Sequence, residues 1–170
     1  MSNAVYENLY EARNNVVKEI SSLNFTQFND RPILNQWSIA QVCHHLVLVE
    51  QATIMAIEWG LKEVDNTRKT RKNVHLILDR TKKIKAPKIV EPGVEPFEVE
   101  SIIDMLADSR KKLLTFLSSI EDKSILALKS TNHPALGELP LDQWIEQIYL
   151  HEQRHIEQIK EIKLHVDVSQ

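Results

Sequence analysis

The stretch "LHEQRHIEQI" at residues 150–159 places His151, Glu152 and His155 in the spacing H-E-x-x-H. On a helix, two histidines four residues apart lie on one face and can bind the same metal ion. In zinc proteases the glutamate of this motif acts as the base. Because the chain has seven histidines in 170 residues, such a pair also arises by chance. The spacing alone leaves open a metal site or two core histidines that hydrogen-bond to neighbouring helices.

The protease interpretation requires a third ligand close behind the motif. The extended zinc-protease pattern needs glycine at position 158 and histidine at position 161, where this chain has Gln158 and Glu161. His165 lies on the same predicted helix, about 15 Å beyond His155 by helical rise, and cannot turn back to the metal. No strand is evident that would bind a peptide edge to edge. We therefore reject a protease and expect the third ligand on another helix.

The segment "WSIAQVCHHLVLVEQATIMAIEWG" offers that ligand. Ser38 and Gln41 form a capping box that marks the start of a helix, and Gly60 is a plausible end. At about 100° per residue, His45 lies at the edge of the apolar stripe and His44 points away from it, so geometry favours His45. We expect a change at His44 to cost about 0.5 kcal/mol or less, as surface changes do. Cys43 lies roughly 160° from His45 on the helix and is interpreted as a small core residue.

The helices that must position these residues follow from the spacing of apolar residues and helix breakers. Four long amphipathic segments cover residues 4–23, 37–60, 99–120 and 140–165, and few glycines or prolines interrupt them. This pattern predicts an all-α four-helix bundle, one domain over residues 1–170. An extra irregular or short helical segment is expected between the second and third helices, at residues 61–96. The stretches "NDRPILNQ" and "NHPALGELP" are predicted to be loops.

Composition excludes several classes of function. The net charge of −3 favours no association with nucleic acid or membrane. Residues 68–88 hold nine of the 21 basic residues but no aromatic residue for base stacking, which favours a solvated surface. No apolar run spans a membrane and the start shows no secretory signal. A single cysteine fits the reducing cytosol, so a cytoplasmic protein is expected.

Several other side chains have two interpretations. Glu50 and Glu152 project from apolar helix faces. Pairing with a buried arginine such as Arg110 is favoured over orienting a ligand or moving a proton. His133 is expected to serve a turn near the site. The two remaining histidines, His75 and His165, are expected to face solvent. A second apolar strip on the 37–60 helix is a candidate dimer contact and consists of Leu48, Met55 and Trp59.

Two stretches together resemble a known family. "RPILNQWSIAQVCHHL" and "HPALGELPLDQWIEQIYLHEQRHIEQI" are similar to the DinB-like (YfiT-like) superfamily of metal-dependent enzymes. The family pattern H-x-x-x-H falls on His151 and His155. Its patterns W-S-x-x-[EQ]-V-x-x-H-L and H-P-x-x-G fall on Trp37, Ser38, Gln41, Val42, His45 and Leu46, and on His133, Pro134 and Gly137.

The resemblance implies a four-helix bundle, often a homodimer, in which His45, His151 and His155 hold a divalent ion, zinc or nickel. Some relatives transfer low-molecular-weight thiols such as bacillithiol or mycothiol to electrophiles. The expected function is therefore transfer of such a thiol to a small-molecule substrate, with the chemistry at the metal. The alternatives are a metal-dependent hydrolase of a small molecule, or a non-catalytic metal-binding stress-response bundle.

Overall fold

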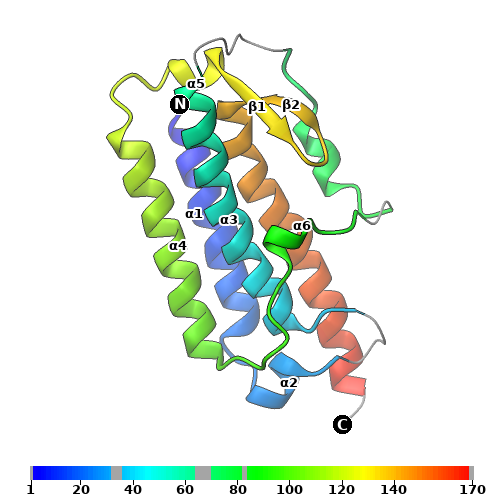
Figure 1. Ribbon diagram of the computed structural model, residues 1–170. Coiled ribbons are helices and arrows are strands. Elements are labelled where there is room, and N and C mark those ends of the chain that lie inside the picture. The colour runs from blue at the N-terminus through cyan, green and yellow to red at the C-terminus, as the bar shows by residue number, and fades with distance from the viewer. Residues whose placement is uncertain (1, 32–35, 64–69, 82–83, 169–170) are drawn as a thin grey trace.

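A computed structural model describes residues 2–31, 36–63, 70–81 and 84–168, and four long helices dominate it (Figure 1). These are α1 (Asn3–Ile20), α3 (Ile39–Lys62), α4 (Val99–Ser119) and α6 (Leu141–Val168). The shorter elements are α2 (Phe25–Asn29), η1 (Val74–Leu78), η2 (Lys88–Val90), α5 (Ile125–Leu128), β1 (Ser130–His133) and β2 (Gly137–Pro140). The predicted four-helix bundle, with short helical turns between its second and third long helices, is confirmed.

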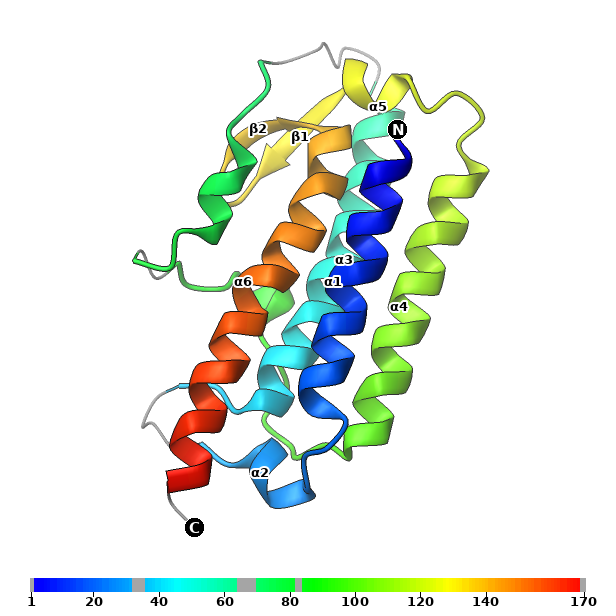
Figure 2. The same ribbon diagram turned by 180° about the vertical axis from the view of Figure 1, so that it is seen from behind.

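The long helices are arranged as two parallel pairs. In Figures 1 and 2, α1 and α6 run from the end of the bundle that holds the hairpin towards the end that holds α2, and α3 and α4 run the opposite way. The chain must therefore return along the whole bundle between α3 and α4. The described residues of this connection lie along the outside of α3 and α6 (Figures 1 and 2), where η1 contacts α6 and η2 contacts α3.

The start of α3 agrees with the prediction from the sequence, whereas its end differs from that prediction. The Ser38 side chain accepts from the Gln41 backbone, and the Gln41 side chain accepts from the Ser38 backbone, so the predicted capping box is present. Gly60 was expected to end the helix, but α3 continues to Lys62. Gly60 is buried, and a Cβ there would lie 2.7 Å from the Leu141 side chain. Its role is to admit a close neighbour.

The expectation that the chain has no strand is wrong, because "NHPALGELP" contains most of a small hairpin. Strands β1 and β2 pair antiparallel, from Ser130 opposite Pro140 to His133 opposite Gly137. Gly137 has a φ of +69°, in the left-handed region that glycine adopts without strain. Sequence patterns missed the hairpin because its strands are only four residues long and mostly polar.

The loop predicted over "NDRPILNQ" is only partly described. Its residues 32–35 lie outside the described residues, as do Arg68, Lys69, Lys82 and Lys83 of the basic segment. The preceding residues form α2, which begins with a capping box of Asn24 and Gln27. That box is readable in the sequence, whereas a helix of five residues carries no amphipathic period.

The core consists of two apolar clusters with a charged layer between them. On every long helix the charged layer falls between residues of the two clusters. It contains Arg13 of α1, Glu50 of α3, Arg110 of α4 and Glu152 of α6. All four side chains are buried, so the bundle encloses two positive and two negative charges at its centre.

Each carboxylate of this charged layer contacts both arginines. Glu152 accepts from Arg13 Nε at 2.6 Å and from Arg110 Nη2 at 3.0 Å. Glu50 accepts from Arg13 Nη2 at 2.9 Å and from Arg110 Nε at 2.6 Å. Burial alone would raise the pKa of Glu50, but Arg13 and Arg110 bring it below its ordinary value. The arginines also donate to the backbone carbonyls of Leu9 and Leu106, so every guanidinium nitrogen of Arg13 and Arg110 has an acceptor inside the bundle.

Replacing one carboxylate by its amide tests this layer. Glu152→Gln keeps the shape but leaves two buried guanidinium groups with one carboxylate, and we expect the free energy of unfolding to fall by about 3–5 kcal/mol. The control is Glu157→Gln, which removes an exposed ion pair with Lys160 on the same helix and should cost about 0.5 kcal/mol or less. Urea denaturation measures both, and equal losses would contradict the charged layer.

Candidate metal centre

Three histidines converge between α3 and α6. One ring nitrogen from each of His45, His151 and His155 lies within 4.8 Å of the others. The two Nε2 atoms of His151 and His155 are 3.1 Å apart. The structure thus brings together the three residues that the sequence singled out.

Hydrogen bonds from Nδ1 set the tautomer of two of these rings. His45 donates from Nδ1 to the backbone carbonyl of Val90 at 2.7 Å, and His155 donates from Nδ1 to Gln158 Oε1 at 2.8 Å. Metal-binding histidines characteristically donate their other N–H to such an acceptor, which fixes the tautomer and the ring orientation. In both rings, Nε2 therefore carries a lone pair.

The environment favours the neutral form of all three rings. Burial lowers the pKa of His155 to about 3, with a further contribution from His45. Burial lowers the pKa of His151 well below its ordinary value, and the neighbouring His155 and His45 add to this effect. The pKa of His45 is lowered by burial as well. Neutral imidazoles are the form that binds a metal ion.

The donor set fits a divalent ion. Two nitrogens bound to tetrahedral zinc at about 2.0–2.1 Å would lie roughly 3.3 Å apart, close to the His151–His155 separation. A nitrogen of His45 lies within 4.8 Å of nitrogens of both rings. A cluster of imidazoles without carboxylate or thiolate suits Zn²⁺ or Ni²⁺ and disfavours Mg²⁺ or Ca²⁺.

The outer face of His45 is covered by an aromatic ring and by the chain that carries Val90. The Trp37 ring lies 4.9 Å from the His45 ring, centroid to centroid. His45 and His155 are buried, while His151 is only partly buried. Of the three histidines, His151 is thus the most exposed.

His44 does not face the centre, but the expectation that it behaves as a surface residue is wrong. Its Nδ1 accepts from the Gly93 backbone N–H at 3.0 Å, and its ring packs on Phe97 with centroids 4.8 Å apart. The side chain is half-buried, and burial lowers its pKa. The connection after η2 folds over this helix face, which periodicity within α3 alone does not reveal.

The two carboxylates near the histidines belong to the charged layer. The pairing of Glu50 and Glu152 with Arg110, favoured from the sequence, is confirmed, and Arg13 is the second partner. Glu152 is 1% exposed and both of its oxygens accept from arginine. A zinc-protease base must instead reach a water on the metal, so its arginine partners remove Glu152 from that role.

The other histidines and the single cysteine lie away from the three converging rings or serve the fold. His133 serves the hairpin turn, because its Nδ1 accepts from the Ala135 and Leu136 backbones and its ring packs on Trp144. Cys43 is fully buried, which raises its pKa to about 12 and confirms it as a core residue. His75 and His165 are exposed, as expected.

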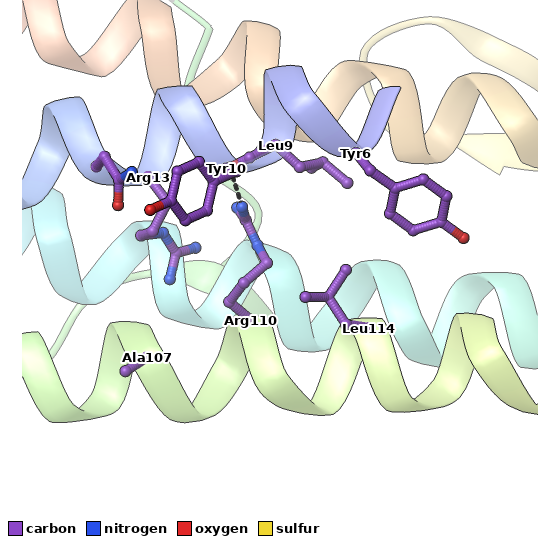
Figure 3. A pocket seen from close by; sticks show the side chains of 8 residues that line it. Tyr6, Leu9, Tyr10, Arg13, Ala107, Arg110 and Leu114 are labelled. Carbon is purple, nitrogen blue, oxygen red and sulfur yellow. Dashed lines mark hydrogen bonds between the residues drawn. The ribbon is translucent and has the colours of Figure 1, made fainter. Parts of the chain in front are cut away.

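A groove of about 250 Å³ lies between α1 and α4 and is separate from the histidines. Figure 3 shows Arg13 and Arg110 between these helices, with Tyr10 and Leu114 nearby. Its lining is mostly apolar, and its two charged residues are those of the charged layer. The residues that line the groove include no histidine, cysteine or carboxylate, and the candidate metal ligands lie elsewhere, at the three histidines.

Basic residues of the middle segment contact acidic residues of α6. Arg71 pairs with Asp142 and Glu146, and Arg80 pairs with Glu161. These ion pairs hold the segment against the bundle and neutralise part of its charge.

In the described part of the chain, no helix combines the length and apolar character needed to cross a membrane.

Comparison with known proteins identifies the family and supports the fold. The model of the DinB superfamily matches residues 8–159. This chain belongs to the DinB superfamily. The uncharacterized protein YuaE of Bacillus subtilis (strain 168) is 29% identical over 153 residues, which cover 90% of this chain and 93% of YuaE. TT2238, described as a four-helix bundle protein, has a TM-score of 0.62 at 14% identity and covers 94% of this chain and 98% of its own.

The depressed histidine pKa values predict loss of stability in acid for the metal-free protein. The pKa of His133 is lowered to about 4 by burial, whereas an unfolded histidine titrates near 6.5. Between these values the unfolded state binds more protons, so stability is complete above pH 6.5 and falls as the pH drops. Each such histidine adds at most about 1.4 kcal/mol per pH unit.

His133→Asn isolates one of these contributions. The asparagine oxygen retains an acceptor for the turn but removes the titrating ring. We expect urea denaturation between pH 7 and pH 4 to show a shallower fall in stability than the wild type. His75→Asn, at an exposed site, should leave the slope unchanged. An identical slope in His133→Asn and the wild type would contradict the lowered pKa.

Proposed function

We propose that this protein is a metal-dependent enzyme that transfers a low-molecular-weight thiol to an electrophilic small molecule. His45, His151 and His155 would hold the divalent ion, Zn²⁺ or Ni²⁺. The observation that carries the proposal is the convergence of three neutral imidazoles, two of them with Nδ1–H already bonded to oxygen. Three histidine ligands leave coordination positions open, as in catalytic zinc sites and unlike structural ones.

The reaction needs a thiolate near neutral pH. The thiol loses its proton to solvent, its sulfur forms a bond to the electrophilic carbon, and the leaving group departs with the electron pair. A divalent ion at the three histidines would lower the pKa of the thiol bound to it. The chain's part is to hold the imidazoles in place, with Val90 and Gln158 as acceptors, and to shield one side with Trp37.

The protein's own acidic and nucleophilic groups around the centre are engaged elsewhere. Cys43 is buried with a pKa raised to about 12, so it supplies no thiolate at neutral pH. Glu50 and Glu152 are bonded to arginines. This favours chemistry carried by the metal and an incoming thiol over a covalent intermediate on the protein.

A homodimer is also proposed, through the strip of α3 that contains Leu48, Met55 and Trp59. Met55 is 52% exposed and Trp59 is 57% exposed. Large apolar side chains exposed on one helix face favour burial against a second copy of the chain. The strip does not include the histidines, so the site would stay accessible in the dimer.

Metal stoichiometry tests the ligand set. His45→Ala leaves two histidines and should lose most of the bound metal, because two imidazoles hold a divalent ion weakly. His75→Ala is the matched control, since His75 is exposed and remote in sequence from the ligands. Atomic emission on both purified variants gives the metal content per chain. Full occupancy in His45→Ala would show that the ligand assignment is wrong.

The reaction itself is tested with a panel of thiols and electrophiles incubated with the metal-loaded protein. Mass spectrometry should find a product that joins one thiol to one electrophile in the wild type and not in His45→Ala. A product that gains water instead would favour a hydrolase, and full metal content without any product would favour a non-catalytic bundle. Metal-dependent cleavage of casein would overturn the exclusion of a protease.

A further inference from the structure

Residues 87–98, which comprise η2 and its connection to α4, are called the strap. The strap is bonded to three residues in the first turns of α3. Val90 of the strap accepts from His45 at 2.7 Å. Gly93 donates its N–H to His44 Nδ1 at 3.0 Å and accepts from Gln41 Nε2 at 3.0 Å. Both backbone groups of Gly93 are thus satisfied by side chains of one helix.

The far end of the strap is fixed as well. Asn29 of α2 accepts from the Phe97 N–H and donates to the Phe97 carbonyl, each at 2.9 Å. The Phe97 ring then packs against the His44 ring. His44 therefore contacts the strap twice, through a hydrogen bond at Gly93 and through a ring contact at Phe97.

The carbonyl that orients His45 belongs to η2, which packs on α3. Within η2, Val90 donates to the Pro87 carbonyl at 2.9 Å, and Glu91 donates to the Lys88 carbonyl at 3.2 Å. These bonds shape the turn but do not tie it to α3. The Val90 side chain is buried, and the next hydrogen bonds to α3 in the chain direction are those at Gly93. Three residues beyond Val90, Gly93 thus adds hydrogen bonds to α3 that can fix the height of η2 along this helix.

We propose that His44 is a positioning residue for the metal centre, which acts through Gly93 to hold the Val90 carbonyl against His45. The inference rests on the proposed metal centre and adds a residue that binds no metal. Removing a direct partner of a metal-binding histidine lowers metal affinity about 10- to 100-fold. Because His44 acts through one further link, about a fivefold loss is expected.

Two substitutions separate the two contacts of His44. In His44→Asn the side-chain oxygen branches at the same position as Nδ1 and can accept from Gly93, but the ring is gone. In His44→Phe a ring remains to pack on Phe97, but no acceptor is present. If the hydrogen bond positions the strap, His44→Phe should raise the dissociation constant for Zn²⁺ about fivefold and His44→Asn should stay within about twofold of the wild type.

The experiment measures Zn²⁺ affinity by competition with a chelator and the visible spectrum of the Co²⁺-loaded protein. Urea denaturation of the metal-free variants is measured in parallel. A changed Co²⁺ spectrum and weaker Zn²⁺ binding in His44→Phe alone would support the positioning role. Affinity that simply follows stability, or equal losses in both variants, would overturn it and indicate a packing role.

The same data distinguish this inference from the metal centre itself. If the wild type and both variants bind Zn²⁺ equally tightly, the centre stands and the role of His44 is wrong. If the wild type takes up no Zn²⁺ or Co²⁺, both proposals fail together. His45→Ala provides the reference for loss of a ligand.

Discussion

The four buried charges of Arg13, Glu50, Arg110 and Glu152 fix how the helices of this bundle lie against one another. Apolar side chains alone tolerate a shift of one helix by a turn, because one aliphatic residue can take the place of another. Buried charges do not, since a helix displaced by a turn would place an unpaired charge in an apolar cluster. Each long helix contributes to the layer, so the axial position of every one is set by it.

The histidine site depends on this alignment. Glu152 lies between His151 and His155 in the sequence, and Glu50 follows His45 on α3 by little more than one turn. Once both carboxylates contact the arginines, the rotation and height of α3 and α6 are determined. The imidazoles then meet on the side of these helices that faces the strap. In the motif H-E-x-x-H, the two histidines thus belong to the candidate metal centre, and the glutamate fixes the position of α6 through the charged layer.

The sequence predicted the long helices and the meeting of His45 with His151 and His155, because both follow from the turn of a helix and the position of its apolar face. Arg13 was missed as a partner of the carboxylates, since which arginine reaches the centre depends on how α1 packs. The acceptor for His45 could not be foreseen, because it is the backbone carbonyl of Val90, and a carbonyl that every residue carries leaves no signal in the sequence. The surroundings of His44 were missed for the same reason, as they arise from a chain segment 49 residues away.

The charged layer also bears on how the bundle assembles. A partly formed bundle that lacked α1 would hold two carboxylates with one arginine, and one that lacked α6 would hold two arginines with one carboxylate. Either assembly would have an uncompensated charge in its interior or would have to admit water there. Three-helix intermediates are therefore disfavoured relative to the complete fold. The protein should accordingly fold as a single cooperative unit, in which the docking of α6 is as necessary as the docking of α1.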